Sequence, residues 1–186
     1  MKEIFLAGGC FWGTERLMTL VPGVVSAECG YANGDPSIIP DYRLVCSHTT
    51  LYRETVRTVY DPSEVSLEYL LCVFYASIDP SLVDRQGNDF GPQYQACVFW
   101  SDPGDERIVR EVSEKVAANC DEFKVILEPL NVFFRAEEEH QGYLERNPSG
   151  YCHVEPGLMR KVAEGTFVMD YMPGKMHTRM FRVSGS

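Results

Sequence analysis

LAGGCFWGTERL, residues 6–17, joins an apolar run to a helical pattern through two glycines. Residues 3–8 are mostly apolar and end at this glycine pair, which predicts a short buried strand. Residues 11–20 predict a helix, which Pro22 and Gly23 terminate. Cys10 is therefore expected at a strand-to-helix turn, where the chemistry of its thiol depends on the start of the helix.

Strand and helix patterns are mixed along the first 150 residues, with no repeat and no linker. Further strands are predicted at 24–31, 54–60, 94–100 and 125–130, helices at 42–47, 66–79, 106–118 and 136–145, and a long polar loop at 79–93. This order predicts an α+β fold, a two-layer split βαβ (ferredoxin-like) sandwich with extra elements. One domain is expected over residues 1–152, followed by a loosely structured C-terminal tail over 153–186.

Composition and charge exclude several classes of protein. The chain has 186 residues and a formal net charge of −10, with a pI near 4.8, which argues against nucleic acid or an anionic membrane as partner. No apolar run approaches the ~18 residues of a membrane span, and the apolar stretch before Cys10 is too short for a signal core. We therefore expect a cytoplasmic protein. Seven cysteines without a CxxC pair predict neither a disulfide framework nor a zinc site, so no metal is expected.

The surroundings of Cys10 favour a reactive thiol. A helix N-terminus lowers the pKa of a thiol, the glycines allow close approach to the sulfur, and Phe11 and Trp12 supply an apolar wall. The alternative is a buried core cysteine, because free cysteine is among the most buried residue types. That alternative suits the cysteines inside predicted apolar elements, which are Cys29, Cys72 and Cys97.

Six segments, in order, carry a resemblance to a known family. They are GCFWG, PGVVSAECGY, YRLVCS, ETVRTVYDP, RQGNDFGPQY and AEEEHQGYLERNPSGYC. Over roughly residues 3–152 the chain resembles the A-type peptide methionine sulfoxide reductases. The resemblance implies an enzyme that reduces the S epimer of methionine sulfoxide, free or in proteins, and so repairs oxidised proteins.

The resemblance also implies a role for each matching residue. Cys10 is the nucleophile that becomes a sulfenic acid, Glu54 the general acid, and Cys152 the resolving thiol that forms a disulfide with Cys10. The substrate-binding residues are Phe11 and Trp12 around the S-methyl group, Tyr42 and Tyr94 at the oxygen, and Asp89 in the pocket loop. No cofactor is implied, because thioredoxin is the expected partner that supplies electrons.

The chain departs from its family at the segment before the acid. Relatives usually have Gly-His-Ala there, whereas this chain has Leu51-Tyr52-Arg53, and IPDY replaces the commoner NPTY before Tyr42. The bulky Tyr52 and the charged Arg53 predict an altered pocket rim. From the residues alone, the favoured interpretation of Glu54 is a surface group on the polar face of a strand.

Other interpretations of the whole chain stay open at this stage. A peroxide-reducing thiol protein would need Cys10 and Cys152 but no acid, and a redox sensor would need no catalysis. Five of the seven methionines follow residue 158, which predicts either a tail that packs on the body or oxidisable sites that the enzyme itself repairs: Met159, Met169, Met172, Met176 and Met180.

Overall fold

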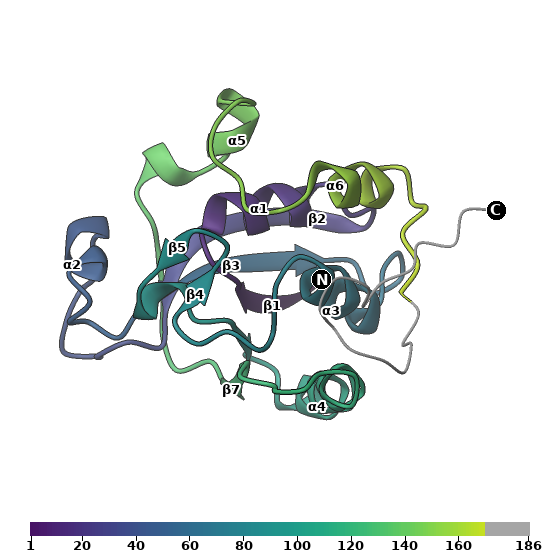
Figure 1. Ribbon diagram of the computed structural model, residues 1–186, viewed down its shortest axis with the longest axis horizontal. Helices are drawn as coiled ribbons and strands as arrows, with labels where there is room; N and C mark the ends of the chain where they lie inside the picture. The colour runs from purple at the N-terminus through teal and green to yellow at the C-terminus, as the bar shows by residue number, and fades with distance from the viewer. Residues whose placement is uncertain (170–186) are drawn as a thin grey trace.

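The computed structural model describes residues 1–169, and a six-stranded sheet forms its centre (Figure 1). The strand order is β7-β6-β1-β3-β2-β8, and every neighbouring pair is antiparallel except β6 and β7. The bounds are β1 Lys2–Ala7, β2 Val24–Ala32, β3 Arg53–Tyr60, β6 Cys97–Trp100, β7 Ile126–Pro129 and β8 Phe133–Arg135. The edge strands are short, with four residues in β7 and three in β8.

The inner four strands have the topology of a split βαβ fold. The units β1-α1-β2 and β3-α3-β6 interleave to give the order β6-β1-β3-β2, with α1 at Phe11–Thr19 and α3 at Leu67–Ala76. A third helix, α4 at Glu106–Ala117, packs beside α3 and near β7 (Figure 1). The predicted α+β two-layer fold is confirmed, and β7 and β8 are the extra elements at its edges.

Alternation along the strands decides what each face of the sheet contacts. Ile4 and Leu6 of β1 point into the main core, where they pack with the buried Leu17 of α1 and Leu70 of α3. Full burial of each such side chain contributes about 1.5–3 kcal/mol. Phe5 points to the opposite face, where its ring meets that of Phe133 at 5.2 Å. The face of β1 that carries Ile4 and Leu6 therefore packs against α1, and the end of β1 leads directly into that helix.

Two predicted segments have a different structure. Within the expected loop 79–93, strands β4 at Arg85–Gln86 and β5 at Asp89–Phe90 form a hairpin, and a 3-10 turn, η1 at Pro92–Tyr94, follows it. The expected helix 136–145 is wrong. It divides into η3 at Glu138–His140 and α5 at Tyr143–Arg146, because Gly142 adopts a left-handed conformation with φ +60° between them.

The described part of the expected tail is packed on the domain. Helix α6 spans Pro156–Ala163, and Leu158, Val162 and Phe167 of this region are buried in the main core. Met159 and Met169 also pack against that core, whereas residues 172, 176 and 180 lie outside the described residues. Among residues 1–169 there is no helix of the length and apolarity that a membrane span needs.

Candidate active site

Cys10 caps the N-terminus of α1, directly after the turn that ends β1. Gly9 makes this turn with φ +81°, and a Cβ on it would lie 2.7 Å from the Cβ of Gln86. Only glycine fits that position without strain, so the turn delivers Cys10 to the start of the helix as predicted. The cysteine is 8% exposed and packs in a cluster with Phe11 and Tyr31.

The pKa of the Cys10 thiol is raised above its ordinary range, so the predicted lowering is wrong for the unliganded protein. Burial is the main cause, and the nearby Glu54 carboxylate adds to it. The backbone N–H of Trp12, at the helix start, acts in the predicted direction and lowers the pKa, but burial outweighs it. The resting enzyme therefore holds Cys10 as a neutral thiol.

Glu54 is a buried acid beside this thiol, and not a surface group. It lies on β3 opposite Tyr31 of β2, on the sheet face that α1 covers, and is 2% exposed. Its Oε2 accepts a hydrogen bond of 3.1 Å from the backbone N–H of Phe11. Burial raises the pKa of Glu54 to about 8, and the Phe11 hydrogen bond acts against that rise. The carboxyl is accordingly protonated at neutral pH.

The unusual residues before Glu54 leave its charge state unaltered. Arg53 alternates to the other face of β3, where its side chain donates to the Leu51 carbonyl and lies near Cys97. Tyr52 is buried on the same face as Glu54, and its hydroxyl is 3.1 Å from the carbonyl oxygens of both Asp35 and Ile38. Tyr52 thus fastens the loop that precedes the short helix α2, Tyr42–Cys46, and it is not among the charges that act on the pKa of Glu54.

Both predicted tyrosines lie at this site. Tyr42 begins the short helix α2, Tyr42–Cys46, and Tyr94 ends η1. Both rings pack against the buried cluster that contains Cys10 and Phe11. Burial is the main cause that raises the pKa of each phenol; Cys46 is the next cause for Tyr42, and the charge of Glu54 is the next for Tyr94. A neutral phenol is a hydrogen-bond donor, so each ring brings a donor to this cluster.

Asp89 comes to the same region from the β4–β5 hairpin. Its charge raises the pKa of Glu54 and of Tyr94, and its Oδ2 accepts a 3.0 Å hydrogen bond from the Tyr151 hydroxyl. That bond joins the hairpin to the segment that carries Cys152. The prediction of a loop for this region missed the hairpin, and the role of Asp89 was implied by the family resemblance alone.

An aromatic wall, which we define as Trp12, His140 and Tyr143, borders the site. The ring of Trp12 stacks on that of Tyr143 with centroids 3.8 Å apart, and its Nε1 donates to Nδ1 of His140 at 3.3 Å. Burial lowers the pKa of His140, so its imidazole is neutral and can accept this bond. Sequence reasoning predicted Trp12 but missed His140 and Tyr143, for which EEEHQGY in the motif 136–152 was the only signal.

Cys152 lies in the connection between α5 and α6, beside the first turn of α1. A Cβ on Gly13 would be 3.2 Å from Cys152 Sγ and 3.1 Å from the His153 ring. The charge of Cys152 also influences the pKa of Cys10. All seven cysteines are free thiols. The structure thus brings Cys10, Glu54 and Cys152 to one helix terminus in a reduced state.

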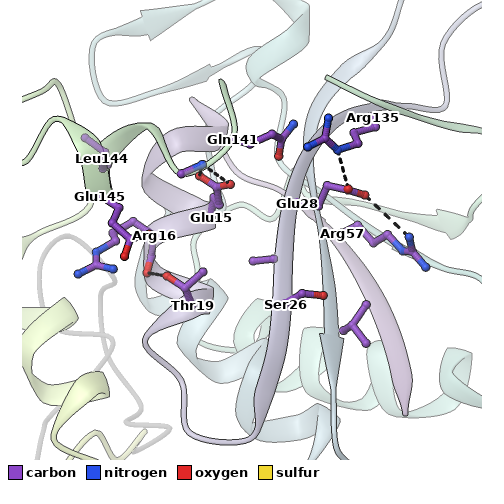
Figure 2. Close-up of a pocket in the computed structure, with 13 residues that line it drawn as sticks. Glu15, Arg16, Thr19, Ser26, Glu28, Arg57, Arg135, Gln141, Leu144 and Glu145 are labelled. Carbon is purple, nitrogen blue, oxygen red and sulfur yellow. Dashed lines mark hydrogen bonds and ion pairs between the residues drawn. The ribbon is translucent and has the colours of Figure 1, made fainter. Parts of the chain in front are cut away.

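Two cavities of the described residues lie outside this site. One of about 300 Å³ lies between the second half of α1, β2 and α5, and it contains none of the predicted site residues (Figure 2). Another, of about 360 Å³, surrounds Lys2 and the first residues of the chain. Within residues 1–169, no three His, Cys, Asp or Glu side chains are grouped so that they could hold a metal ion.

Comparisons with known proteins agree with this arrangement. Residues 2–169 match the family described as "Peptide methionine sulfoxide reductase". The protein of that name, MsrA, from Clostridium botulinum (strain Kyoto / Type A2) is 45% identical over 157 residues, which cover 83% of this chain and 98% of the relative. MsrA from Clostridium perfringens (strain ATCC 13124) is 42% identical over 156 residues, 83% of this chain and 99% of the relative.

Solved structures show the same similarity in three dimensions. Mxr1 from Saccharomyces cerevisiae in reduced form has a TM-score of 0.78 and 33% identity, over 83% of this chain and 91% of that one. Methionine sulfoxide reductase A of Corynebacterium diphtheriae has a TM-score of 0.74 and 34% identity, over 81% and 77% of the two chains. This chain belongs to the peptide methionine sulfoxide reductase family, and it is an enzyme that reduces methionine sulfoxide.

Proposed function

We propose that this enzyme reduces the S epimer of methionine sulfoxide, free or in proteins, through a sulfenic acid on Cys10. The observation that carries the proposal is the pair formed by the Cys10 thiol and the buried, protonated Glu54 at the start of α1. Oxide is a poor leaving group, so a neutral carboxyl next to the nucleophile answers the main chemical need of the reaction.

In the first step, the sulfur of Cys10 attacks the sulfur of the sulfoxide. The oxygen takes the proton of Glu54 and transfers to Cys10, and the thiol proton replaces the one that Glu54 donated. The products are Cys10 sulfenic acid and methionine, so that two electrons pass from the thiol to the substrate. Because both groups start neutral, no charge has to be desolvated before substrate enters this buried site.

Substrate orientation follows from the groups around this pair. The hydroxyls of Tyr42 and Tyr94 donate to the sulfoxide oxygen, while Asp89 holds the Tyr151 segment over the site. Phe11 and the aromatic wall receive the S-methyl group. A sulfoxide sulfur has three different substituents, so donors on one side and an apolar wall on another select a single epimer.

In the second step, the Cys152 thiol attacks the sulfenic sulfur, forms the Cys10–Cys152 disulfide and releases water. The position of Cys152 beside Gly13, one turn from Cys10, supports this role. A dithiol protein of the thioredoxin class then reduces the disulfide, and no other cofactor is needed. For comparison, Mxr1 has been solved in complex with Trx2. The proposal includes protein repair in the cytoplasm, on the sequence argument alone.

The test is a turnover assay with separate sulfoxide epimers. Wild type with dithiothreitol should consume only the S epimer, Cys10→Ser should consume neither, and Cys152→Ser should release about one methionine per enzyme in the absence of reductant. Cys120→Ser is the matched control, since Cys120 packs against the main core and not at the site. Consumption of both epimers at equal rates, or faster turnover of hydrogen peroxide than of sulfoxide, would contradict the proposal.

A further inference from the structure

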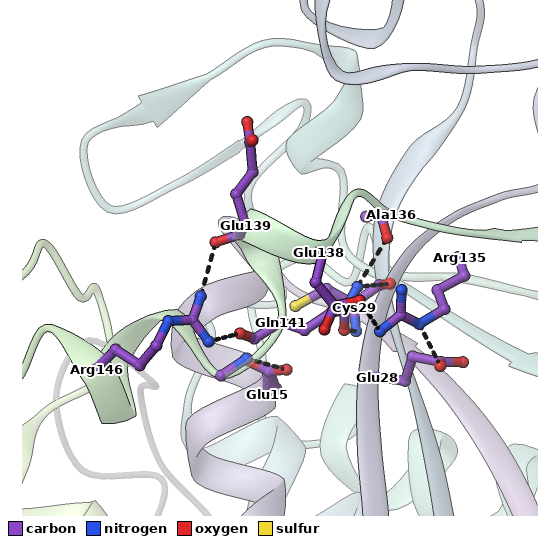
Figure 3. Close-up of polar contacts among 10 residues, drawn as sticks. Glu15, Glu28, Cys29, Arg135, Ala136, Glu138, Glu139, Gln141 and Arg146 are labelled. Carbon is purple, nitrogen blue, oxygen red and sulfur yellow. Dashed lines mark hydrogen bonds and ion pairs between the residues drawn. The ribbon is translucent and has the colours of Figure 1, made fainter.

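Two side chains that the proposed chemistry does not use hold the wall segment, residues 136–143, against the sheet. The first is Gln141, whose amide behaves like an additional strand residue at the edge of β2 (Figure 3). Its Oε1 accepts from the Cys29 backbone N–H at 2.9 Å, and its Nε2 donates to the Cys29 carbonyl and to the Ala136 carbonyl, each at 3.0 Å. This side chain ties the segment to β2, together with the Ala136 N–H, which donates to the Cys29 carbonyl at 2.9 Å, and Glu137, whose Oε2 accepts from the Tyr31 hydroxyl at 2.8 Å.

The second is Glu15, a carboxylate on α1 that is only 4% exposed. Its two oxygens accept from the backbone N–H of Gly142 at 2.9 and 3.0 Å. Dashed lines at Glu15 mark these bonds in Figures 2 and 3. The Cys29 thiol also hydrogen-bonds to this carboxylate. Burying a carboxylate costs free energy that an apolar side chain would avoid, so the bonds that Glu15 makes are what retain the wall segment in place.

The outer side of the segment is held more loosely. Arg146 donates to the carbonyls of Gln141 and Glu139, the latter at 3.1 Å, but its side chain is exposed (Figure 3). Hydrogen bonds of exposed groups contribute less than those of buried ones, because water competes for both partners. Glu137 holds the start of the segment, because its carboxylate accepts from the Tyr31 hydroxyl and the Tyr42 N–H, each at 2.8 Å. Glu15 and Gln141 hold the part of the segment between His140 and Tyr143.

The position of these anchors relates them to the thiol. Glu15 lies five residues after Cys10 on the same helix, and Gln141 and Gly142 lie between His140 and Tyr143 in the chain. His140 and Tyr143 both contact Trp12, the wall residue that lies two positions after Cys10 on α1. Helix α1 thus carries the thiol at its start, and from its middle Glu15 holds the segment that supplies the other two wall residues.

We propose that Glu15 and Gln141 are positioning residues that set the separation between the Cys10 thiol and the aromatic wall, and thereby the affinity for the sulfoxide. The inference rests on the proposed role of Trp12 as part of the substrate wall. Neither residue touches substrate or transfers a proton. Loosening the wall should weaken substrate binding much more than it slows the step at sulfur.

The kinetic test compares Glu15→Ala with Glu15→Gln in steady-state assays with methionine sulfoxide. Glu15→Ala removes the acceptor for the Gly142 N–H, and KM is expected to rise about tenfold while kcat changes less than about twofold. Glu15→Gln keeps one oxygen for that N–H and should restore most of the affinity. Glu145→Gln is the control, since Glu145 is exposed and lines the same cavity as Glu15, while its side chain makes no hydrogen bond to the wall segment within residues 1–169.

A second measurement reports the wall without reference to activity. The chain has two tryptophans, and the indole N–H resonance of Trp12, assigned by Trp12→Phe, reports its bond to His140, while that of Trp100 in the main core serves as reference. Glu15→Ala should shift and broaden the Trp12 resonance and leave Trp100 unchanged. If Glu15→Ala does not fold, Gln141→Met, which removes three hydrogen bonds without a charge, replaces it.

The outcomes separate this inference from the proposed function. An unshifted Trp12 resonance together with an unchanged KM, in either variant, would overturn the positioning role. A shifted resonance with unchanged KM would also overturn it, and would show that the wall does not contribute to substrate affinity. The Cys10→Ser assay does not depend on any of these results. If the positioning role fails, that assay still tests the proposed thiol chemistry separately.

Discussion

Replacing Glu54 with glutamine should change how the stability of the enzyme depends on pH. The folded protein raises the pKa of this carboxyl from 4.5 to about 8, mainly by burial. Between these two values the folded state holds a proton that the unfolded state has released. The stability that this proton contributes is complete below pH 4.5 and is lost as the pH rises toward 8. Glutamine does not titrate, so Glu54→Gln removes that loss.

The expected size follows from the width of the window. Each pH unit within it changes the free energy of unfolding by about 1.4 kcal/mol, which amounts to roughly 5 kcal/mol over the full window from 4.5 to about 8. Glutamine can still accept the hydrogen bond from the Phe11 N–H, so the variant should fold. From pH 5 to pH 8, wild type should therefore lose stability steadily while Glu54→Gln does not, so that the difference in the free energy of unfolding shifts toward the variant.

Urea denaturation of the reduced proteins at pH 5, 6, 7 and 8 measures this difference directly. Glu139→Gln, at an exposed position, is the control and should parallel wild type at every pH. A difference between wild type and Glu54→Gln that stays constant within about 0.5 kcal/mol would show that Glu54 is ionised when folded, and it would refute the role of a neutral acid. In activity assays, Glu54→Gln should lower kcat about 10²–10⁴-fold, and wild-type activity should decline above pH 8.

Three further substitutions test separate features. Gly13→Ala would place a Cβ 3.2 Å from Cys152 Sγ, so disulfide formation should slow about tenfold while the first methionine is released at the normal rate; rapid-quench thiol counts that match wild type would contradict this. Leu51→Gly should stabilise the protein by about 0.5–1 kcal/mol in urea titrations, because Leu51 has φ +61° and is 59% exposed; a loss of stability would refute the strain. Tyr52→Phe removes hydrogen bonds to two loop carbonyls and should cost about 1–2 kcal/mol, against no change if the loop is held by other contacts.

Local sequence patterns were sufficient for the frame of the fold. The strand, glycine pair and helix around Cys10 are where the pattern predicts them, and Ser66 caps α3 through the Tyr69 N–H as its residue type indicates. The run around residues 136–145 was misread because its glutamates favour helix while Gly142 interrupts it. Strand β8 was missed because three residues are too few for alternation to be recognised.

The site was predictable only where a motif named its residues. His140 and Tyr143 contact Trp12 because Gln141, which lies between them in the chain, is hydrogen-bonded to Cys29, 112 residues away in the sequence. No local sequence pattern contains that contact. The pKa of Cys10 was predicted in the wrong direction for a related reason. The helix N-terminus is visible in the sequence, whereas the packing that removes water from the sulfur is a property of the tertiary structure.

The short strands at the two edges of the sheet affect how the enzyme interacts with unfolded polypeptides. Oxidised polypeptides are often partly unfolded, and such chains readily add to any long, flat, unpaired strand that they meet. Here the edge strand β7 has only four residues and ends at Pro129. The other edge strand, β8, has three residues and ends at the charged Arg135. An oxidised polypeptide therefore finds little unpaired strand backbone with which to form hydrogen bonds, which favours its release after catalysis over aggregation with the enzyme.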